Sequence, residues 1–589
     1  MEDDATTVVR FAGGAWERAA WDRLRDAAQR ACTRRTLGAR RAQYHKRVEE
    51  ELAALAELGL QPGVLLELAW VVKDLRARGV TFGPGYGPQC GSLLLHTLGL
   101  NGVDPLEHAL PFLGFGRELE ARRLHLRVAS RAEQAELSSA LRRYSRPPLE
   151  LERAPGELEI VVGWDSSLAL TRDLERMARQ VNGGYECDPT AWAYPWEDPE
   201  TLRLIARGET EGIAALEAPP LPERLRESAP RSLEEVVQVM VACRETAPAG
   251  LPERYSGARS GAARPPLPHP ALEAVLAPTA HLWLYREQVV ASLARLLGCD
   301  WQRALELCEH LAEERRQSDE GAQSRQLAEA IAERNGLPHA RGLYLVRALR
   351  QAIPQVVDRA AILAEATEAY RQAYYKARYP AAFQAARLNA VLLQLSPHAG
   401  LRYSHGSAPV PLCPHREALS TLCRETVRDG ITVLPPDINR SGWGFQALDR
   451  RTLLFGLGAI ATVDKAAAER LVQLRRSGEY RGLKDLVARG FGGNFEAEPL
   501  EPLILAGALD GIVRDRWGLL EELEEARRPR RPWLREISRG KRTQPLPWGA
   551  TRPREGWAFQ RELDVLGCVP SRGYFPEPEP PERCLRPVK

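Results

Sequence analysis

The sequence predicts a mainly helical α+β protein with one small sheet, and three observations lead to this prediction. Apolar residues recur at three- and four-residue spacing, typical of amphipathic helices, over residues 46–78, 284–350 and 359–395. Strand-like segments, short and alternating or β-branched, are confined to residues 79–85, 123–128, 157–164 and 430–436. Proline-rich stretches that indicate linkers or domain edges lie at residues 218–222, 264–270 and 574–581.

Length and composition exclude several classes of protein. The chain has 589 residues and a formal net charge of +3, and at about 100–200 residues per domain it should form roughly three to five domains. Its apolar runs fall short of the ~20 residues of a membrane-spanning helix, and its first residues lack the apolar core of a secretory signal. The ten cysteines form no CxxC pair, which argues against a disulfide scaffold or a structural zinc site. We expect a cytoplasmic protein with no membrane partner and no bound metal.

A glycine-rich loop follows the first strand-like segment and precedes an apolar helix. It reads GPGYGPQCGS, and its candidate phosphate-binding residues are Gly83, Gly85, Gly87, Gly91 and Ser92. Glycines let backbone amides approach a polyphosphate, and the start of a helix adds partial positive charge. A loop of this kind is also found as an ordinary turn, so both interpretations stay open at this point.

The wider pattern resembles a known family. The order helix, strand, glycine loop and helix, followed by DPLEHALPF at residues 104–112, resembles the palm of the bacterial DNA polymerase III alpha subunit, a C-family DNA polymerase. Residues 208–218, 268–290 and 369–383 resemble its fingers, residues 433–445, 455–472 and 503–512 resemble its helix-hairpin-helix region, and residues 559–576 resemble the chain beyond it. This resemblance implies a helical lead (1–42), a palm-like domain without the thumb (43–190), a helical fingers-like domain (191–429), a helix-hairpin-helix segment (430–515) and a basic, proline-rich tail (516–589).

The positions that correspond to the family's metal ligands carry unsuitable side chains. In the family, an Asp-x-Asp pair and a third Asp hold two magnesium ions; the resemblance places His125 and Arg127 at the pair and Asp165 at the third position. An arginine does not ligate magnesium, and one carboxylate cannot organise two ions. Tyr86 and Pro88 replace the family's Arg and Ser that face the triphosphate. We therefore expect a shortened, catalytically degenerate homologue that uses no cofactor; magnesium would matter only if the chain were an active polymerase.

Two segments are candidates for DNA contact. The hairpin at residues 461–465 offers Lys465 to a phosphate, although Asp464 would repel it, and a purely structural helix pair is the alternative. The tail is a proline-broken basic run with one aromatic residue, suited to a phosphate chain and an exposed base; its residues are Arg527, Arg528, Arg530, Arg531, Trp533, Arg535, Arg539, Lys541 and Arg542. A solvated linker that neutralises the acidic residues 521–526 is the alternative for the tail.

A short peptide in the tail resembles a clamp-binding motif. Gln544, Leu546 and Trp548 match the Q-x-L-x-aromatic pattern by which bacterial polymerases dock on the sliding clamp, with an amide for hydrogen bonds and two apolar anchors. Its place in the tail resembles the error-prone branch of the family.

These features predict a non-catalytic accessory protein in DNA replication or damage-tolerant DNA synthesis. Its expected partners are DNA and also the sliding clamp and another DNA polymerase. Two alternatives stay open: an active C-family DNA-directed DNA polymerase of the error-prone type, and a protein-interaction module without DNA contact.

Overall fold

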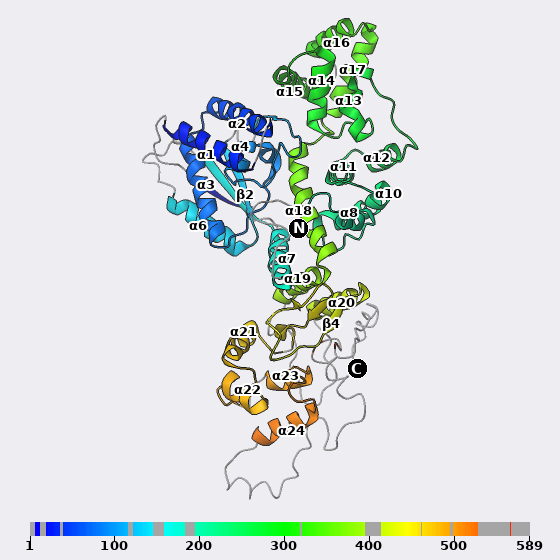
Figure 1. Cartoon of the computed structure of the whole chain (residues 1–589). Helices are drawn as coiled ribbons and strands as arrows, with labels where there is room; N and C mark the ends of the chain where they lie inside the picture. Colours follow the sequence, from blue (N-terminus) through cyan, green and yellow to red (C-terminus); the bar gives the residue numbers. More distant parts are fainter. Residues whose placement is uncertain are drawn as a thin grey trace, which may run out of the picture. The chain divides into compact units, whose positions relative to one another are not determined.

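A computed structural model gives the fold of the chain (Figure 1). The residues that the structure describes are 6–11, 19–35, 39–115, 122–144, 158–182, 195–317, 321–394, 414–460, 462–494, 497, 499–527, 566 and 570. The chain divides into two compact units: unit 1 comprises residues 1–172 and 187–374, and unit 2 comprises residues 173–186 and 375–589.

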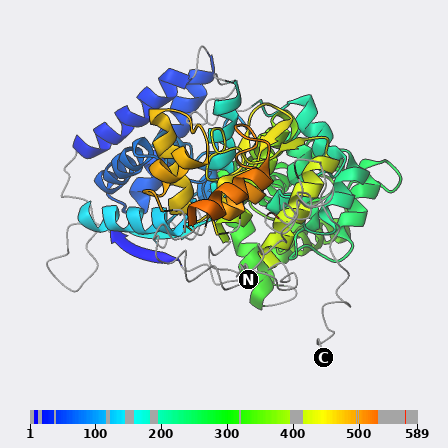
Figure 2. The ribbon, with the colours of Figure 1, turned by 90° about the horizontal axis from the view of Figure 1, so that it is seen from below.

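Unit 1 contains a three-stranded sheet with the order β1-β3-β2. Strands β2 (Arg123–Val128) and β3 (Leu158–Trp164) are parallel, and β1 (Thr7–Phe11) pairs antiparallel with β3. Helices α1 (Ala19–Arg35), α2 (Ala39–Glu57), α3 (Pro62–Ala77), α4 (Leu93–Thr97) and α6 (Arg131–Tyr144) surround it. Figure 2 shows α6 beside β1, and apolar residues of strands and helices form one core.

Two expectations for this region need correction. Residues 1–42 were expected to be a helical lead, but residues 7–11 form the edge strand β1 and Val9 is buried in the core. Residues 79–85 were expected to be a strand, but only Phe82 makes a bridge, to Val128. The glycines on either side of Phe82 explain the difference, because Gly79 and Gly85 have φ angles of 98° and 120° that an extended strand does not use.

The rest of unit 1 is helical, as expected. It begins with α8 (Pro199–Ala206), α9 (Ala214–Glu217), α10 (Leu221–Ser228), α11 (Leu233–Cys243) and α12 (Leu251–Arg259). A second core joins α13 (Glu273–Leu276), α14 (Arg286–Leu297), α15 (Trp301–Gln317), α16 (Ala322–Arg334) and α17 (His339–Ala352). The long helix α18 (Arg359–Arg378) follows and continues into unit 2.

Unit 2 carries a second small sheet that the sequence analysis did not separate from the first. Strand β4 (Thr432–Leu434) is parallel to β6 (Thr452–Leu454), and β5 (Gln446–Ala447) is antiparallel to β6. The helices of this unit are α19 (Pro380–Gln394), α20 (Pro414–Arg428), α21 (Lys465–Leu474), α22 (Leu483–Gly490), α23 (Leu500–Leu505) and α24 (Arg516–Arg527). Helix α7 (Ser166–Asn182) begins in unit 1 and ends in unit 2. Within the described residues, no single helix is long and apolar enough to cross a membrane, and one bent pair, α2 with α3, meets that test only in combination.

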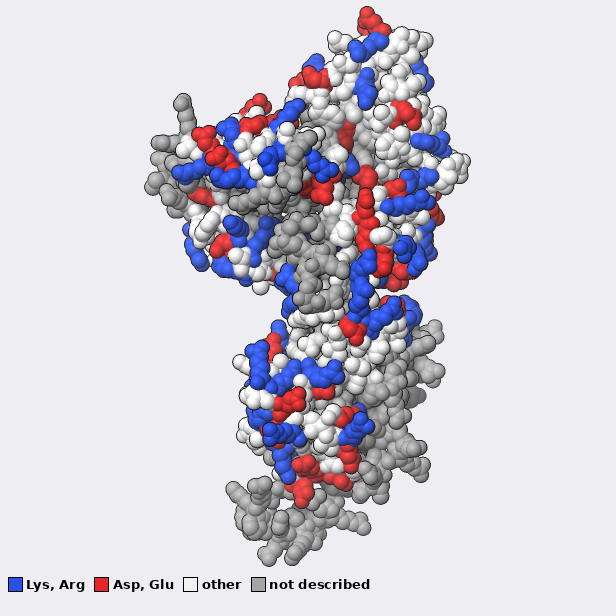
Figure 3. All heavy atoms as spheres, viewed as in Figure 1, with Lys and Arg blue, Asp and Glu red and all other residues white. Residues whose placement is uncertain are grey.

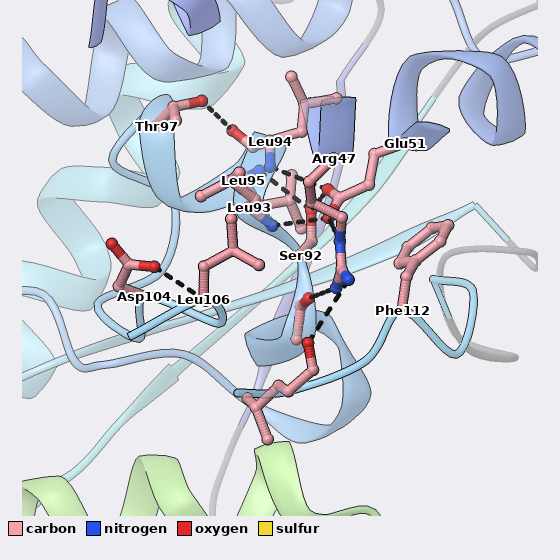
Figure 4. Close-up of polar contacts among 12 residues, drawn as sticks. Arg47, Glu51, Ser92, Leu93, Leu94, Leu95, Thr97, Asp104, Leu106 and Phe112 are labelled. Atoms are coloured by element: carbon pink, nitrogen blue, oxygen red, sulfur yellow. Dashed lines mark hydrogen bonds and ion pairs between the residues drawn. The ribbon is translucent and has the colours of Figure 1, made fainter. Parts of the chain in front are cut away.

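Glu51 in α2 is a fully buried carboxylate that joins α2 to the start of α4 (Figure 4). It accepts hydrogen bonds from the Ser92 hydroxyl at 2.7 Å and from the backbone amides of Leu93 and Leu94 at 2.9 and 2.8 Å. Amides in the first turn of a helix have no acceptor within the helix. The carboxylate therefore satisfies donors that would otherwise be buried without a partner.

Arg47, one turn before Glu51, provides the matching positive charge. Its Nε donates to Glu51 at 2.6 Å, and its Nη2 donates to the carbonyl of Gly91 at 2.9 Å. The guanidinium also lies 5.0 Å from the centre of the Phe112 ring. A buried ion pair is favourable only when its remaining donors and acceptors are satisfied, and these contacts satisfy most of them.

We predict that Glu51→Ala destabilises the protein by about 3–5 kcal/mol, because it leaves the Arg47 guanidinium buried without its carboxylate and removes the acceptor of two helix amides. Urea unfolding followed by circular dichroism measures the change. Glu50→Ala is the matched control, since Glu50 is the exposed neighbour and pairs with Lys46 at 3.8 Å. Equal stability of the two variants would contradict the prediction.

Candidate functional site

The parallel strands β2 and β3 place the predicted site residues at one end of the sheet of unit 1. Leu126 and Val128 of β2 are buried in the core, whereas His125 and Arg127 alternate with them and are only partly buried. Asp165 follows β3 directly, and its backbone N–H donates to the carbonyl of Val128 at 2.8 Å. Because side chains alternate along a strand, His125 and Arg127 share the face that is turned away from the core.

These side chains form one cluster with Tyr86 of the glycine loop. The Arg127 guanidinium lies 3.8 Å from the Asp165 carboxylate and 4.8 Å from the centre of the Tyr86 ring. The rings of Tyr86 and His125 are 4.7 Å apart between their centres. The structure thus brings together four of the residues that the sequence analysis selected, with a guanidinium as the cation of the group.

A further carboxylate in this region, that of Glu365 in α18, was not identified from the sequence. The pKa of Glu365 is raised, chiefly because the surrounding protein displaces part of the water from its carboxylate, while Arg127 lowers it and Asp165 raises it. The side chain remains accessible to solvent, so water screens these interactions. Arg127 is therefore the cationic neighbour of two carboxylates from different parts of the chain.

Helix α18 is held beside this cluster by a buried polar contact with α7. The Thr171 hydroxyl donates to the Glu368 carboxylate, and Gln372 donates from its amide to the carbonyl of Ser167 at 3.1 Å. Glu368 also pairs with Arg371 at 2.8 Å. Since α7 begins just after Asp165, this contact fixes α18 relative to the end of β3.

The residues of the cluster do not suit the two magnesium ions that the family resemblance implies. Magnesium ions that act in phosphoryl transfer are held by carboxylate oxygens, and the resemblance places a guanidinium at one of those positions and an imidazole at another. Among the described residues, no three His, Cys, Asp or Glu side chains gather closely enough to hold a metal ion. Repulsion from Arg127 would further disfavour a divalent cation beside Asp165.

The glycine loop is bound to the surrounding protein through its own donors and acceptors. Gln89 donates from its amide to the carbonyl of Arg123 at 2.9 Å and accepts from the backbone N–H of His125 at 3.2 Å, and thereby extends the edge of β2. The Ser92 hydroxyl donates to Glu51, and Pro88 has no N–H to offer a phosphate. Burial raises the pKa of Cys90 to about 12, so this thiol is not a nucleophile at neutral pH.

The left-handed backbone of the loop favours glycine at Gly85 and Gly87, but not at Gly91. Gly85 has a φ of 120°, and a Cβ there would lie 2.7 Å from the Cys90 sulfur. A Cβ on Gly91 would lie 3.5 Å from the Cβ of Ala360 in α18, which is ordinary contact. Gly87, with a φ of 59°, and Gly83, whose N–H donates to the Arg127 carbonyl at 2.9 Å, complete the turn. The backbone conformation thus accounts for Gly85 and Gly87 without a bound phosphate.

The hairpin before α21 retains the backbone of a glycine turn without the glycines. Thr462 has a φ of 63°, and its buried hydroxyl oxygen has no hydrogen-bond partner among the residues that the structure describes. Asp464 caps α21, with its carboxylate accepting from the amide of Ala467 at 2.6 Å. The side-chain carboxylate of Asp464 thus occupies the start of the helix, where a phosphate would otherwise bind.

Lys465, predicted to contact DNA, lies 5.0 Å from the centre of the Trp443 ring and 3.8 Å from the Glu469 carboxylate. Arginines around α21 and α22 are exposed as well, and Figure 3 shows basic side chains over this part of unit 2. The exposed arginines here are Arg440, Arg470, Arg476 and Arg481.

Arg527 is the one predicted tail contact within the described residues. Its guanidinium pairs with Glu524 at 3.0 Å and lies 3.8 Å from Glu501, and its side chain is mostly buried. We therefore leave Arg527 out of the candidate DNA surface. The other tail residues, from Arg528 to Arg542, and the clamp peptide Gln544, Leu546 and Trp548 lie outside the described residues.

Three family models match separate parts of the chain. Residues 22–122 match the bacterial DNA polymerase III alpha NTPase domain, and residues 170–335 match the bacterial DNA polymerase III alpha subunit finger domain. Residues 430–519 match the helix-hairpin-helix motif. Residues 123–169, which contain β2 and β3, lie outside all three matched ranges. The first match begins at residue 22, before the boundary at 43 that the sequence analysis expected.

Among curated proteins, the chain is similar to DNA polymerase III alpha subunits. It is 28% identical to that of Halalkalibacterium halodurans over 60% of this chain and 29% of the relative. It is 28% identical to that of Thermus aquaticus over 56% of this chain and 25% of the relative, and 26% identical to that of Escherichia coli K12 over 57% of this chain and 27% of the relative. The matched part thus spans less than a third of the length of these relatives.

We predict that Thr462→Gly stabilises unit 2 by about 1 kcal/mol, because it relieves a β-branched residue from a left-handed backbone and removes a buried hydroxyl without a partner. Thermal unfolding measures the change. Thr432→Gly is the control: Thr432 lies exposed in β4, and glycine should weaken a strand there. A loss of stability in Thr462→Gly would contradict the prediction.

Proposed function

The chain is a homologue of the bacterial DNA polymerase III alpha subunit, and from this premise we propose that it acts as a non-catalytic accessory in DNA replication or damage-tolerant DNA synthesis. The observation that carries the proposal is the Arg127–Asp165 contact of 3.8 Å at the end of the sheet. A guanidinium there opposes the bound magnesium that polymerase chemistry needs.

The alternative, an active C-family polymerase, requires other residues to hold the metal ions and the triphosphate. The Ser92 hydroxyl and the amides that follow it already donate to Glu51, and Pro88 supplies no donor. The rings of Tyr86 and His125 stack on each other beside Arg127. Each of these features favours the accessory role over the polymerase.

We place the proposed DNA contact on the helix-hairpin-helix segment of unit 2. The hairpin itself carries Asp464 at its helix start, which disfavours phosphate at that point. The exposed guanidinium groups of Arg440, Arg476 and Arg481 supply positive charge on the surface nearby, and such groups bind phosphate irrespective of base sequence. The tail from Arg528 to Arg542 would add to this contact.

Further partners in the proposal are the sliding clamp and another DNA polymerase. The clamp would bind the peptide from Gln544 to Trp548, whose prolines favour an extended conformation and so lower the entropy lost on docking. A protein-interaction module without DNA contact is the remaining alternative, and the DNA-binding experiment below distinguishes it.

We predict that the purified protein does not extend a primed template in the presence of magnesium. The double variant His125→Asp with Arg127→Asp should also be inactive, because the donors of the glycine loop remain bound to Glu51. Primer extension on a denaturing gel measures this, with a polymerase-free mock purification as the control. Template-dependent extension by the unmodified protein would reject the accessory role.

We predict that DNA binding depends steeply on salt and little on sequence. Replacing Arg440, Arg476 and Arg481 with Ser should weaken binding to single-stranded DNA and reduce the slope of log K against log salt by about 2, at ~0.7 per lost phosphate contact. Fluorescence anisotropy across a salt series measures both quantities.

Two further variants show which part of the chain binds the DNA. Arg142, Arg143 and Arg254 are exposed arginines of unit 1, and their triple Ser variant should bind as the unmodified protein does. A variant with Ser in place of Arg528, Arg530, Arg531 and Arg535 measures how much the tail contributes to DNA affinity. Undetectable binding of the unmodified protein at low salt would favour the module without DNA contact.

A further inference from the structure

The outer face of helices α3 and α6 in unit 1 carries two exposed aromatic side chains in contact with each other. Trp70 of α3 is 53% exposed, and Tyr144 of α6 is 37% exposed. The centres of their rings lie 5.0 Å apart, and the ring planes are nearly perpendicular, at 80°. Because aromatic residues are enriched at the centres of protein interfaces, this pair is a candidate docking surface.

Two contacts show how α3 and α6 run past each other. Trp70 meets Tyr144 at one end of the face, and Arg78, just after α3, lies 3.7 Å from Glu136 at the other end. Residue numbers rise along α3 where they fall along α6, so the two helices are antiparallel. The stretch from Trp70 to Arg78 is about 12 Å long at 1.5 Å per residue, which gives the length of the face.

Two basic side chains flank the aromatic pair. Lys73 lies almost one turn after Trp70 on α3, and Arg143 directly precedes Tyr144 on α6; both are exposed. Neither forms an ion pair with another residue that the structure describes. Both cations are therefore available to an anionic ligand that docks beside the two rings.

The carboxylates of this face have partners within the protein. Asp74 and Glu136 both pair with Arg78 at the far end of the face. Glu67, almost one turn before Trp70, also has an interaction within the protein. At the aromatic end, two cations thus face one carboxylate that is already engaged, so this end favours a ligand with negative charge.

The chain itself contains a segment of matching chemistry. Residues 576–582 read PEPEPPE and lie outside the described residues. Proline favours the polyproline II conformation, which has three residues per turn and a rise of about 3.1 Å per residue. In that conformation Pro578 and Pro581 would share one ridge and Glu579 and Glu582 the next. The members of each pair would be about 9 Å apart, within the length of the face.

We propose that the α3–α6 face binds residues 576–582 of a second copy of this chain. A proline ring would stack on the indole of Trp70 beside Tyr144, as in other complexes of extended proline-rich peptides with aromatic surfaces. The neighbouring glutamates would pair with Lys73 and Arg143. Two copies that exchange their segments occupy both faces in one symmetric dimer. This inference does not rest on the proposed function, because it concerns how copies of the chain associate.

The first experiment measures binding of a labelled peptide with the sequence of residues 574–583 to the full chain, by fluorescence anisotropy at protein concentrations too low for association. Trp70→Ala should weaken binding about tenfold or more, because it removes the aromatic anchor. Lys73→Glu with Arg143→Glu should weaken it as well, and salt should weaken binding to the unmodified protein. Tyr344→Ala is the matched control, because Tyr344 of α17 is a similarly exposed aromatic residue, at 47%, and its loss should leave peptide binding unchanged.

The second experiment, sedimentation equilibrium of the full chain, identifies where the segment comes from. The unmodified protein should form dimers at high concentration and dissociate on dilution. Trp70→Ala, and separately a variant with Gln in place of Glu577, Glu579 and Glu582, should remain monomeric at the same concentrations.

Several results would overturn the proposal. One is a peptide that does not bind, or that binds Trp70→Ala as tightly as it binds the unmodified protein. Another is a monomer at every concentration; tighter peptide binding by the Gln variant would then assign the face to the segment of the same copy. A third is tighter peptide binding by Glu150→Gln with Glu152→Gln, which would show that residues 145–157 already compete for the face.

Discussion

The buried carboxylate of Glu51 is the contact on which the candidate site of unit 1 depends. It closes the start of α4 through Ser92 and two amides and, through Arg47, it also fixes the carbonyl of Gly91. The loop so held lies against Ala360 at the start of α18 and contributes Tyr86 to the stack on Arg127. Moving any of these donors away would leave a buried charge without its partners, so the contact holds the segment from Gly91 to Leu94 in place.

The charges at the end of the sheet follow from that arrangement. The position of Arg127 in β2 directs its side chain away from the core. The guanidinium lies beside Asp165 at the end of β3. At 3.8 Å, in a partly exposed position, such a pair contributes at most about 1 kcal/mol, so stability alone gives little reason for an arginine here. Its larger consequence is electrostatic: a guanidinium group lies beside the carboxylate of Asp165 and lowers the pKa of Glu365.

The sequence was sufficient for elements with strong local signals. Periodicity predicted strands β2, β3 and β4 and the helical character of residues 284–350. The family resemblance predicted that His125, Arg127 and Asp165 lie close together. Strand β1 was missed because a five-residue edge strand is defined by its pairing with β3, which is more than 140 residues away. Glu51 was missed because a glutamate on a helix ordinarily faces water, and only tertiary packing shows which ones do not. Glu365 was missed because only the tertiary fold brings α18 near Arg127 and Asp165. The proposed tail contacts other than Arg527 were not tested, because they lie outside the described residues.

The hairpin of unit 2 has the backbone of a phosphate-binding turn but lacks the free amides that would bind phosphate. Thr462 adopts the left-handed conformation that glycine would take without cost, and Asp464 places a carboxylate at the helix start, where bare amides would attract phosphate. The surrounding packing must hold this turn in place, because Val463 and Ile460 are buried on either side of it. Phosphate affinity requires free donors and positive charge, whereas the fold requires only the turn. A DNA contact in this unit therefore depends on the exposed arginines beside the hairpin, Arg440, Arg476 and Arg481, rather than on the hairpin itself.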